Sequence, residues 1–224
     1  MRMRDRLLGA AAGLAAVATL VLVPVAGGSA LAQTVAGAHW GVSPYYPNCV
    51  EGPCRVVVIA DKTADATFQA QIQRWATWMN YVRTTYNIKL PAFLYVGPGQ
   101  GLQPDPGCAV ANGIISVCRN DAVVDADCSN PGPSTIRCTA SNVTLGDNHY
   151  VWSKSSFRSS QPLNATDTWT VVCGALGRSI GLPPSGDSSS CLADNLTLGS
   201  GQEKYDVGAD WVALFNLYNH PAGS

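Results

Sequence analysis

Eight cysteines follow a hydrophobic leader in this chain, and together these features restrict the folds that it can adopt. Residues 1–32 begin with three arginines, continue through an Ala/Leu/Val-rich stretch and end in the small residues Ala30-Leu31-Ala32. This order is typical of a cleaved secretory signal peptide. An uncleaved membrane anchor is the alternative, which Gly13 and Pro24 disfavour because they interrupt the apolar span. We therefore expect a secreted, extracellular protein with no membrane contact after removal of the signal.

The cysteines indicate a disulfide framework, because an even number of them in an exported chain usually pairs. A zinc cluster is the alternative, and the lack of any paired C-x-x-C spacing argues against it. The sequence does not choose among the possible connectivities, but short loops favour sequential pairing, and Cys173 with Cys191 is the pair that we expect first. The cysteines are Cys49, Cys54, Cys108, Cys118, Cys128, Cys138, Cys173 and Cys191.

Charge and composition exclude some classes of partner. Charged residues make up 13% of the 224 residues and the net charge is -1, so no basic surface is expected to hold nucleic acid or an anionic membrane. We divide the chain into the signal peptide at 1–32, an N-terminal extension at 33–54 and one domain at 55–224. The sequence leaves the oligomeric state open.

The first part of the domain is predicted to contain short strands and one long helix. Asp61 or Asp65 is placed to cap this helix, and Asn87 ends it. Apolar residues at steps of three and four mark its buried face: Phe68, Ile72, Trp75, Met79, Val82 and Tyr86. The segments with strand character are 55–60, 93–96, 114–117 and 139–147, the last including its turn.

Two polar segments contain residues that could form a calcium site or a catalytic triad, but neither matches the usual motif. Residues 120–133 are rich in Asp, Gly and Pro, so we expect a solvated surface loop. Asp121, Asp125 and Asp127 are a possible calcium set within it, but their spacing is not that of an EF-hand. A Ser-His-Asp arrangement built on Asp147 and His149 lacks the G-x-S-x-G turn that would support it.

A second helix is predicted from Thr168 to Ile180, capped by Thr166 or Asp167 and ended by Gly181. Its apolar residues fall on one stripe, so we expect it to be amphipathic; they are Trp169, Val172, Leu176 and Ile180. Two glycines inside this helix, at 174 and 177, each cost about 1 kcal/mol relative to alanine. A requirement other than helix stability therefore explains the two glycines.

This segment resembles the zinc-binding region of the metzincin metallopeptidases, particularly the small secreted matrixin-like ones. The family motif, V-x-C-H-E-x-G-H-x-x-G-L-x-H followed by S-C-M, supplies three zinc-binding histidines, a general-base glutamate and a methionine turn. The frame of this motif is kept at Val172-Cys173, Leu176-Gly177, Gly181-Leu182 and Ser190-Cys191, and residues 206–218 resemble the closing helix of the family. The resemblance implies an α+β, zincin-like fold in which a twisted mixed sheet packs on helices and the second helix lies beneath a cleft.

The residues that carry the family's chemistry are replaced. Gly174, Arg178 and Pro184 stand at the histidine positions, Ala175 at the glutamate position and Leu192 at the methionine position. Side chains of Gly, Ala and Pro donate nothing to zinc, and a guanidinium repels it. We therefore expect neither zinc nor catalytic residues at this motif, and we expect the replaced positions to accept the family residues.

A displaced metal site is the remaining route to zinc chemistry. The three histidines, His39, His149 and His220, are widely separated, and no helix carries a histidine pair four residues apart. A displaced site would have to combine His149 with nearby acids such as Asp147 or Asp167. Arg178 is the candidate cleft residue, because on a helix it shares a face with residue 174 and should fill the space of a metal. A buried arginine needs an anionic partner. That partner is either an internal acid, for which Asp187 and Asp194 are nearest in sequence, or, if the cleft stays open, an anionic group of a ligand such as a peptide's C-terminal carboxylate.

The sequence thus favours a non-catalytic domain that binds a peptide or an extracellular protein through the inherited cleft. The alternative is an active secreted peptidase or hydrolase that uses a displaced metal or other residues. Metal content distinguishes the two, since the first holds no zinc.

Overall fold

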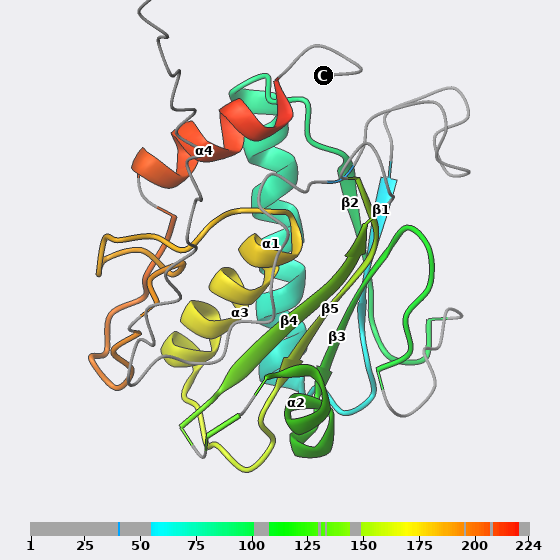
Figure 1. The fold of residues 1–224 in the computed structure, drawn as a ribbon, viewed down its shortest axis with the longest axis vertical. Helices are drawn as coiled ribbons and strands as arrows, with labels where there is room; N and C mark the ends of the chain where they lie inside the picture. The colour runs from blue at the N-terminus through cyan, green and yellow to red at the C-terminus, as the bar shows by residue number, and fades with distance from the viewer. Residues whose placement is uncertain are drawn as a thin grey trace, which may run out of the picture.

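The computed structural model describes residues 40, 55–100, 108–129, 131–132, 134–143, 149–194, 196–206 and 208–219. They form an α+β domain in which helices pack against a five-stranded mixed sheet (Figure 1). The elements are β1 Arg55–Ala60, α1 Ala66–Thr85, β2 Ala92–Val96, β3 Ile114–Arg119, α2 Asp121–Asp127, β4 Arg137–Val143, β5 Tyr150–Phe157, α3 Ala165–Ser179 and α4 Gly208–Tyr218. Several sequence predictions lie outside the described residues, namely the signal peptide, Cys49, Cys54, His39, His220 and Asp147.

The sheet has the strand order β2-β1-β3-β5-β4. Pairing is parallel between β1 and β2, β1 and β3, and β3 and β5, whereas the edge strand β4 runs antiparallel to β5. The predicted strand at 55–60 is β1, and most of its Val/Ile side chains are buried because it lies between two neighbouring strands.

Helix α1 begins where the sequence predicts. Asp65 is its N-cap, with the carboxylate accepting a hydrogen bond from the Phe68 amide, and Asn87 follows the helix with a φ of 51°. All but one of the six predicted core residues are buried. Tyr86 is the exception, with 58% of its surface exposed, because it lies beyond the last helical turn.

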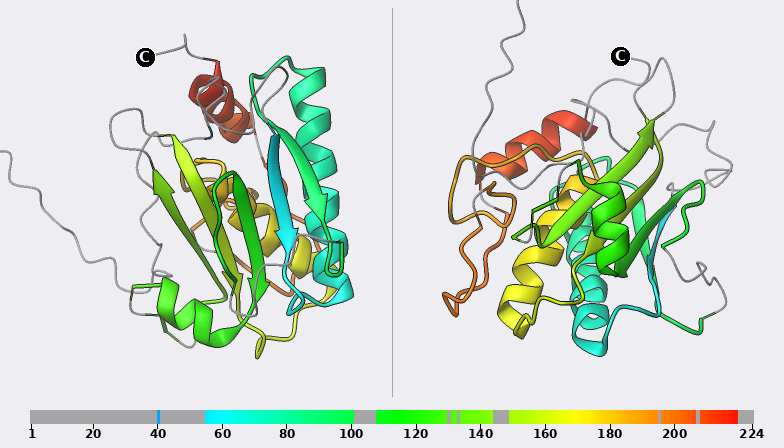
Figure 2. Two further views of the ribbon diagram at one scale, coloured as in Figure 1. Left: turned by 90° about the vertical axis from the view of Figure 1, so that its right-hand side faces the viewer. Right: turned by 60° about the horizontal axis from the view of Figure 1, so that its bottom comes forward.

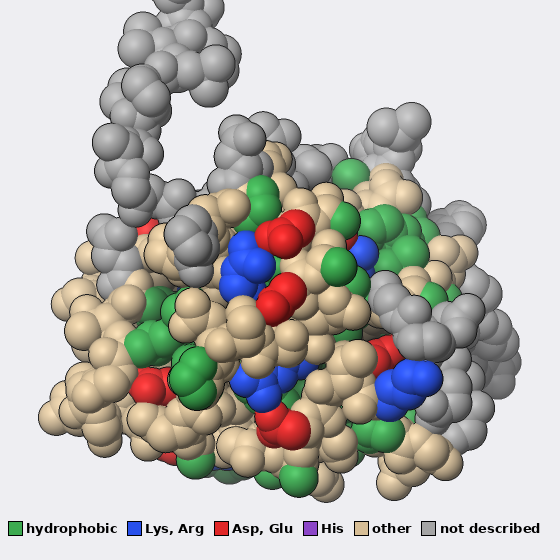
Figure 3. Space-filling model, turned by 90° about the horizontal axis from the view of Figure 1, so that it is seen from below, with side chains coloured by type: hydrophobic (Ala, Val, Ile, Leu, Met, Phe, Trp, Pro, Cys, Tyr) green, Lys and Arg blue, Asp and Glu red, His purple; other side chains and the backbone are tan. Residues whose placement is uncertain are grey.

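The predicted loop at 120–133 is wrong in its first half, where Asn120 caps the short helix α2. Its three aspartates contact other groups instead of converging on a cation: Asp121 accepts from the Ser159 amide, Asp125 pairs with Arg158 and Asp127 pairs with Lys154. The face of the molecule seen from below carries acidic side chains beside basic ones (Figure 3). These pairs explain the acidic composition without calcium.

Strand β5 was not expected from the sequence. It contains Ser153, Ser155 and Ser156, which are all buried although serine is a poor signal for a central strand. The hydroxyls of Ser155 and of Thr139 on β4 donate to the Ala175 carbonyl, both at 3.3 Å. Polar side chains therefore connect this part of the sheet to α3.

Helix α3 is buried on all sides instead of amphipathic, since every residue from Asp167 to Ser179 is buried. Figure 2 shows it beside α1 on one face of the sheet. Its N-cap is Asn164, not Thr166 or Asp167, and Gly181 follows it with a φ of 93°. Indole and phenol groups from distant segments satisfy its last carbonyls: Trp40 donates to Ser179 O and Tyr218 to Ile180 O.

Helix α4 closes the domain over the C-terminal part of α3. Leu214 and Tyr218 are buried, whereas Phe215 is exposed. Among the described residues, no helix is both long and apolar enough to span a membrane.

Candidate functional site

The centre of the degenerate motif contains an arginine that the sequence did not reveal. Arg137, the first residue of β4, donates from Nη1 to the Val171 carbonyl at 3.1 Å and from Nη1 and Nη2 to the Cys191 carbonyl at 3.3 Å. A Cβ atom added at Gly174 would lie 1.9 Å from Arg137 Nη1 and 2.2 Å from Cys191 O. The Arg137 guanidinium thus occupies the space that a side chain at position 174 would need. The sequence analysis expected a different arginine, Arg178, to fill the space of a metal here.

Arg178 lies beside this group and has the acidic partner that the sequence expects. It is 4% exposed, and its Nη2 donates to Asp194 Oδ1 at 3.1 Å and to Leu192 O at 3.0 Å. Asp187, the other candidate, accepts instead from the amide and hydroxyl of Ser189. Burial lowers the pKa of Arg178, while the Asp194 carboxylate opposes that shift.

The remaining motif positions do not converge on a metal site. Ala175 and Leu192 are buried, and Pro184 is exposed. A Cβ atom at Gly177 would lie 2.7 Å from Leu192 Cδ2, so the leucine packs directly under the helix. Ala175, Gly177 and Leu192 therefore serve close packing between α3 and the loop that follows it.

Zinc does not fit this arrangement. Two guanidinium groups line one small cavity of about 90 Å³ together with Asp194, and a cation there would meet like charge. Burial and the neighbouring Arg178 lower the pKa of Arg137 to about 9, which still leaves it protonated at neutral pH. We assign no step of zinc chemistry to this site. The expectation that position 174 accepts histidine is also wrong, because its Cβ would clash with backbone and guanidinium atoms.

The expected disulfide between Cys173 and Cys191 is present, and bonds joining Cys108 to Cys118 and Cys128 to Cys138 follow the same sequential order. Disulfides of this kind indicate an oxidising compartment. The Cys173–Cys191 bond fixes the loop that carries the Cys191 carbonyl against α3, and therefore holds one of the acceptors of Arg137 in place.

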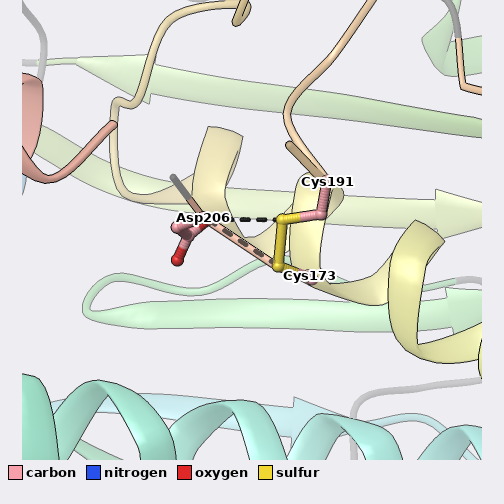
Figure 4. Close-up of side chains that lie close together, drawn as sticks. All are labelled: Cys173, Cys191 and Asp206. Carbon is pink, nitrogen blue, oxygen red and sulfur yellow. Dashed lines mark hydrogen bonds between the residues drawn. A yellow bond between two sulfur atoms is a disulfide. The ribbon is translucent and has the colours of Figure 1, made fainter. Parts of the chain in front are cut away.

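Asp206 points at this disulfide (Figure 4), with Oδ1 3.2 Å from Cys191 Sγ and 3.7 Å from Cys173 Sγ. Burial, and to a lesser extent the nearby Asp210, raises the pKa of Asp206 to about 7. A disulfide sulfur carries no proton, so only the protonated form of the Asp206 carboxyl group can donate in this contact. Among the described residues, Cys173, Cys191 and Asp206 form the one group of three potential metal-ligand side chains whose ligand atoms lie close together. Both sulfurs are already bonded to each other in the disulfide.

The displaced metal site considered from the sequence finds no support at Asp167. Its carboxylate accepts from Asn164 Nδ2 at 2.8 Å and from the Gly199 amide at 2.9 Å. His149 stands just before β5 and belongs to no group of three metal-ligand side chains in the described part of the chain.

An aromatic groove of about 740 Å³ lies on the other side of α3, against the outer face of α1. Arg74 crosses it, 4.2 Å from the Trp169 ring, and pairs with Glu203 at 2.8 Å. Trp78 and Tyr81 stack along α1 beside this pair. No sequence pattern predicts this groove, because it is formed by residues far apart in the chain, from Arg74 on α1 to Trp169 and Tyr205.

We expect loss of Asp194 to destabilise the protein more than loss of its partner Arg178. Asp194→Ala leaves a buried cation beside Arg137 and should lower the free energy of unfolding by about 3 kcal/mol. Arg178→Met keeps most of the buried volume and leaves Asp194 in solvent, since its side chain is 53% exposed, so it should cost less than about 1 kcal/mol. Urea denaturation of both variants checks this order, and a larger loss for Arg178→Met would contradict it.

The sequence matches no protein-family model, and a search of curated proteins finds nothing similar to it.

Proposed function

We propose that this chain is a secreted, zincin-like domain that has lost metallopeptidase activity and binds a peptide or an extracellular protein. The mixed sheet, the two helices on one of its faces, and the loop that crosses α3 at Ser190-Cys191 are consistent with the matrixin-like resemblance. The leader at 1–32 and the disulfides support export.

One observation carries the loss of activity: the Arg137 guanidinium packs against Gly174, where a zinc ligand would have to project. Zinc catalysis needs about three protein donors and an activated water. This site offers two cations, alanine in place of the general base, and carbonyl oxygens that are already hydrogen-bonded. These replacements remove the catalytic groups but keep α3 packed in the domain core. A folded domain without catalytic groups can still bind a partner.

We expect purified, oxidised protein to contain far less than one zinc per chain and to show no peptide hydrolysis that 1,10-phenanthroline inhibits. Elemental analysis after dialysis measures the first, and cleavage of a mixed fluorogenic peptide set measures the second. About one tightly bound zinc per chain, or chelator-sensitive cleavage, would instead favour the active peptidase with a displaced metal.

A further inference from the structure

The arginine cavity contains more positive charge and more hydrogen-bond donors than its described neighbours satisfy. We define the arginine cavity by Arg137, Arg178, Asp194, Ser134 and the apolar side chains of Ile136, Val171, Ala193 and Leu196. Asp194 is the acidic residue among these lining residues, and it pairs with Arg178. Arg137 donates to the carbonyl oxygens of Val171 and Cys191 and has no ion pair with a described carboxylate.

The number of N–H donors also exceeds the number of acceptors around the two arginines. Two guanidinium groups carry about ten N–H donors, and these two make five hydrogen bonds to described residues. Arg178 Nε is buried and has no acceptor among the described residues. Asp210 also attracts Arg178, and its carboxylate accepts a hydrogen bond from Ser190. A buried cation without a matching anion is costly, so the site favours binding of an anion.

The cavity's size and lining restrict the anion. A volume of about 90 Å³ equals roughly three water molecules at ~30 Å³ each, which is room for a small charged head with a short alkyl group. Four apolar side chains line it beside the guanidinium groups, so the preferred ligand has a carbon chain attached to its charge. Ser134 and Asp194 are exposed, so the cavity reaches the surface.

We propose that the arginine cavity binds a carboxylate group, and that its ligand is the C-terminal carboxylate of a peptide ending in a small residue. Arginine binds carboxylates through paired N–H donors, and capture of a chain end needs only the last residue to enter. The inference rests on the proposed function, because it names the part of the peptide that the binding domain recognises. The ligand's carboxylate neutralises Arg137, while Asp194 keeps its bond to Arg178.

Three probes distinguish a peptide C-terminus from a free small carboxylate as the ligand. They are the peptide acetyl-Gly-Gly-Ala with a free C-terminus, the same peptide with a C-terminal amide, and sodium acetate. Binding is followed by NMR titration of the oxidised protein with the neutral chelator 1,10-phenanthroline present, so that any zinc-dependent binding is removed without adding a competing carboxylate. We expect saturable binding of the free acid, at least tenfold weaker binding of the amide, and competition by acetate. Equal affinity for acid and amide, or no saturable shift at ~10 mM acid peptide, would overturn the proposal. Acetate binding as tightly as the peptide would show that a free small carboxylate is the ligand, and would overturn the peptide assignment.

Arg137→Gln tests the residue itself, because it removes the charge and keeps an amide donor. Its affinity for the acid peptide should fall at least tenfold. The matched control is Arg55→Gln, which removes the same charge from an exposed position on β1 and should leave affinity unchanged. Circular dichroism establishes that both variants are folded. If Arg137→Gln is unfolded, Arg137→Lys provides the test, because it keeps the charge but loses the paired N–H donors and should also weaken binding of the acid peptide. Unchanged affinity in a folded Arg137→Gln variant contradicts the proposal, whereas zinc found in the protein contradicts the proposed function independently.

Discussion

Gly174→Ala should destabilise the protein strongly, although alanine is the better helix former. The added Cβ would lie 2.2 Å from the Cys191 carbonyl oxygen, and this atom cannot easily move. Cys191 is joined to Cys173 by a disulfide, and its amide donates to the Tyr205 carbonyl at 3.1 Å. After the gain of about 1 kcal/mol in helix propensity, we expect a net loss of about 3 kcal/mol. That corresponds to a drop in Tm of roughly 6–12 °C for a domain of this size, measurable by calorimetry.

Gly177→Ala is the matched control for this experiment, since it places the same methyl group three residues further along α3. There the nearest atom is Leu192 Cδ2, the end of a flexible side chain that can rotate away. Strain and helix propensity should nearly cancel, so the free energy of unfolding should change by less than about 1 kcal/mol. If the two variants are equally stable, the close contact of α3 with Arg137 and the 191 loop is contradicted.

The features that the sequence predicts correctly are mostly local. The run at 55–60, the stripe on α1, the capping Asp65 and the turn at Gly181 all depend on neighbours within a few residues. The Cys173–Cys191 pair and the Arg178–Asp194 pair span fewer than twenty residues, so chain proximity was enough to suggest each partner.

The features that the sequence missed depend on distant segments. Arg137 is 34 residues from Val171 and 54 from Cys191, and no spacing rule connects them. Strand β5 buries Ser153 and Ser155 because the hydroxyl of Ser153 donates to β4 and that of Ser155 donates to α3. These acceptors lie on other segments, so the sequence alone does not reveal them. The glycine at 174 was the available signal, because a costly glycine inside a buried helix implies that another group occupies its space.

Asp206→Asn should change how stability depends on pH. The pKa of Asp206 is raised from 3.8 to about 7 in the folded protein, mainly by burial. Between pH ~4 and ~7 the folded state holds a proton that the unfolded chain has lost, so stability from this group falls as the pH rises. The full contribution is present below pH ~4 and is lost above pH ~7, and it amounts to at most about 4 kcal/mol.

An asparagine at 206 keeps the shape and a donor beside the disulfide but carries no titrating proton. We therefore expect the variant to be more stable than the wild type by a few kcal/mol at pH 8 and similar to it at pH 4, measured by urea denaturation across this range. Asp187→Asn is the control. Hydrogen bonds from Ser189 lower the pKa of Asp187, so this group stabilises the fold at higher pH. Its replacement should therefore leave the loss of stability between pH ~4 and pH ~8 in place. Parallel pH profiles for wild type and Asp206→Asn would mean that Asp206 is ionised in the folded protein, and a carboxylate cannot donate to a disulfide sulfur. The contact in Figure 4 would then lack its hydrogen bond.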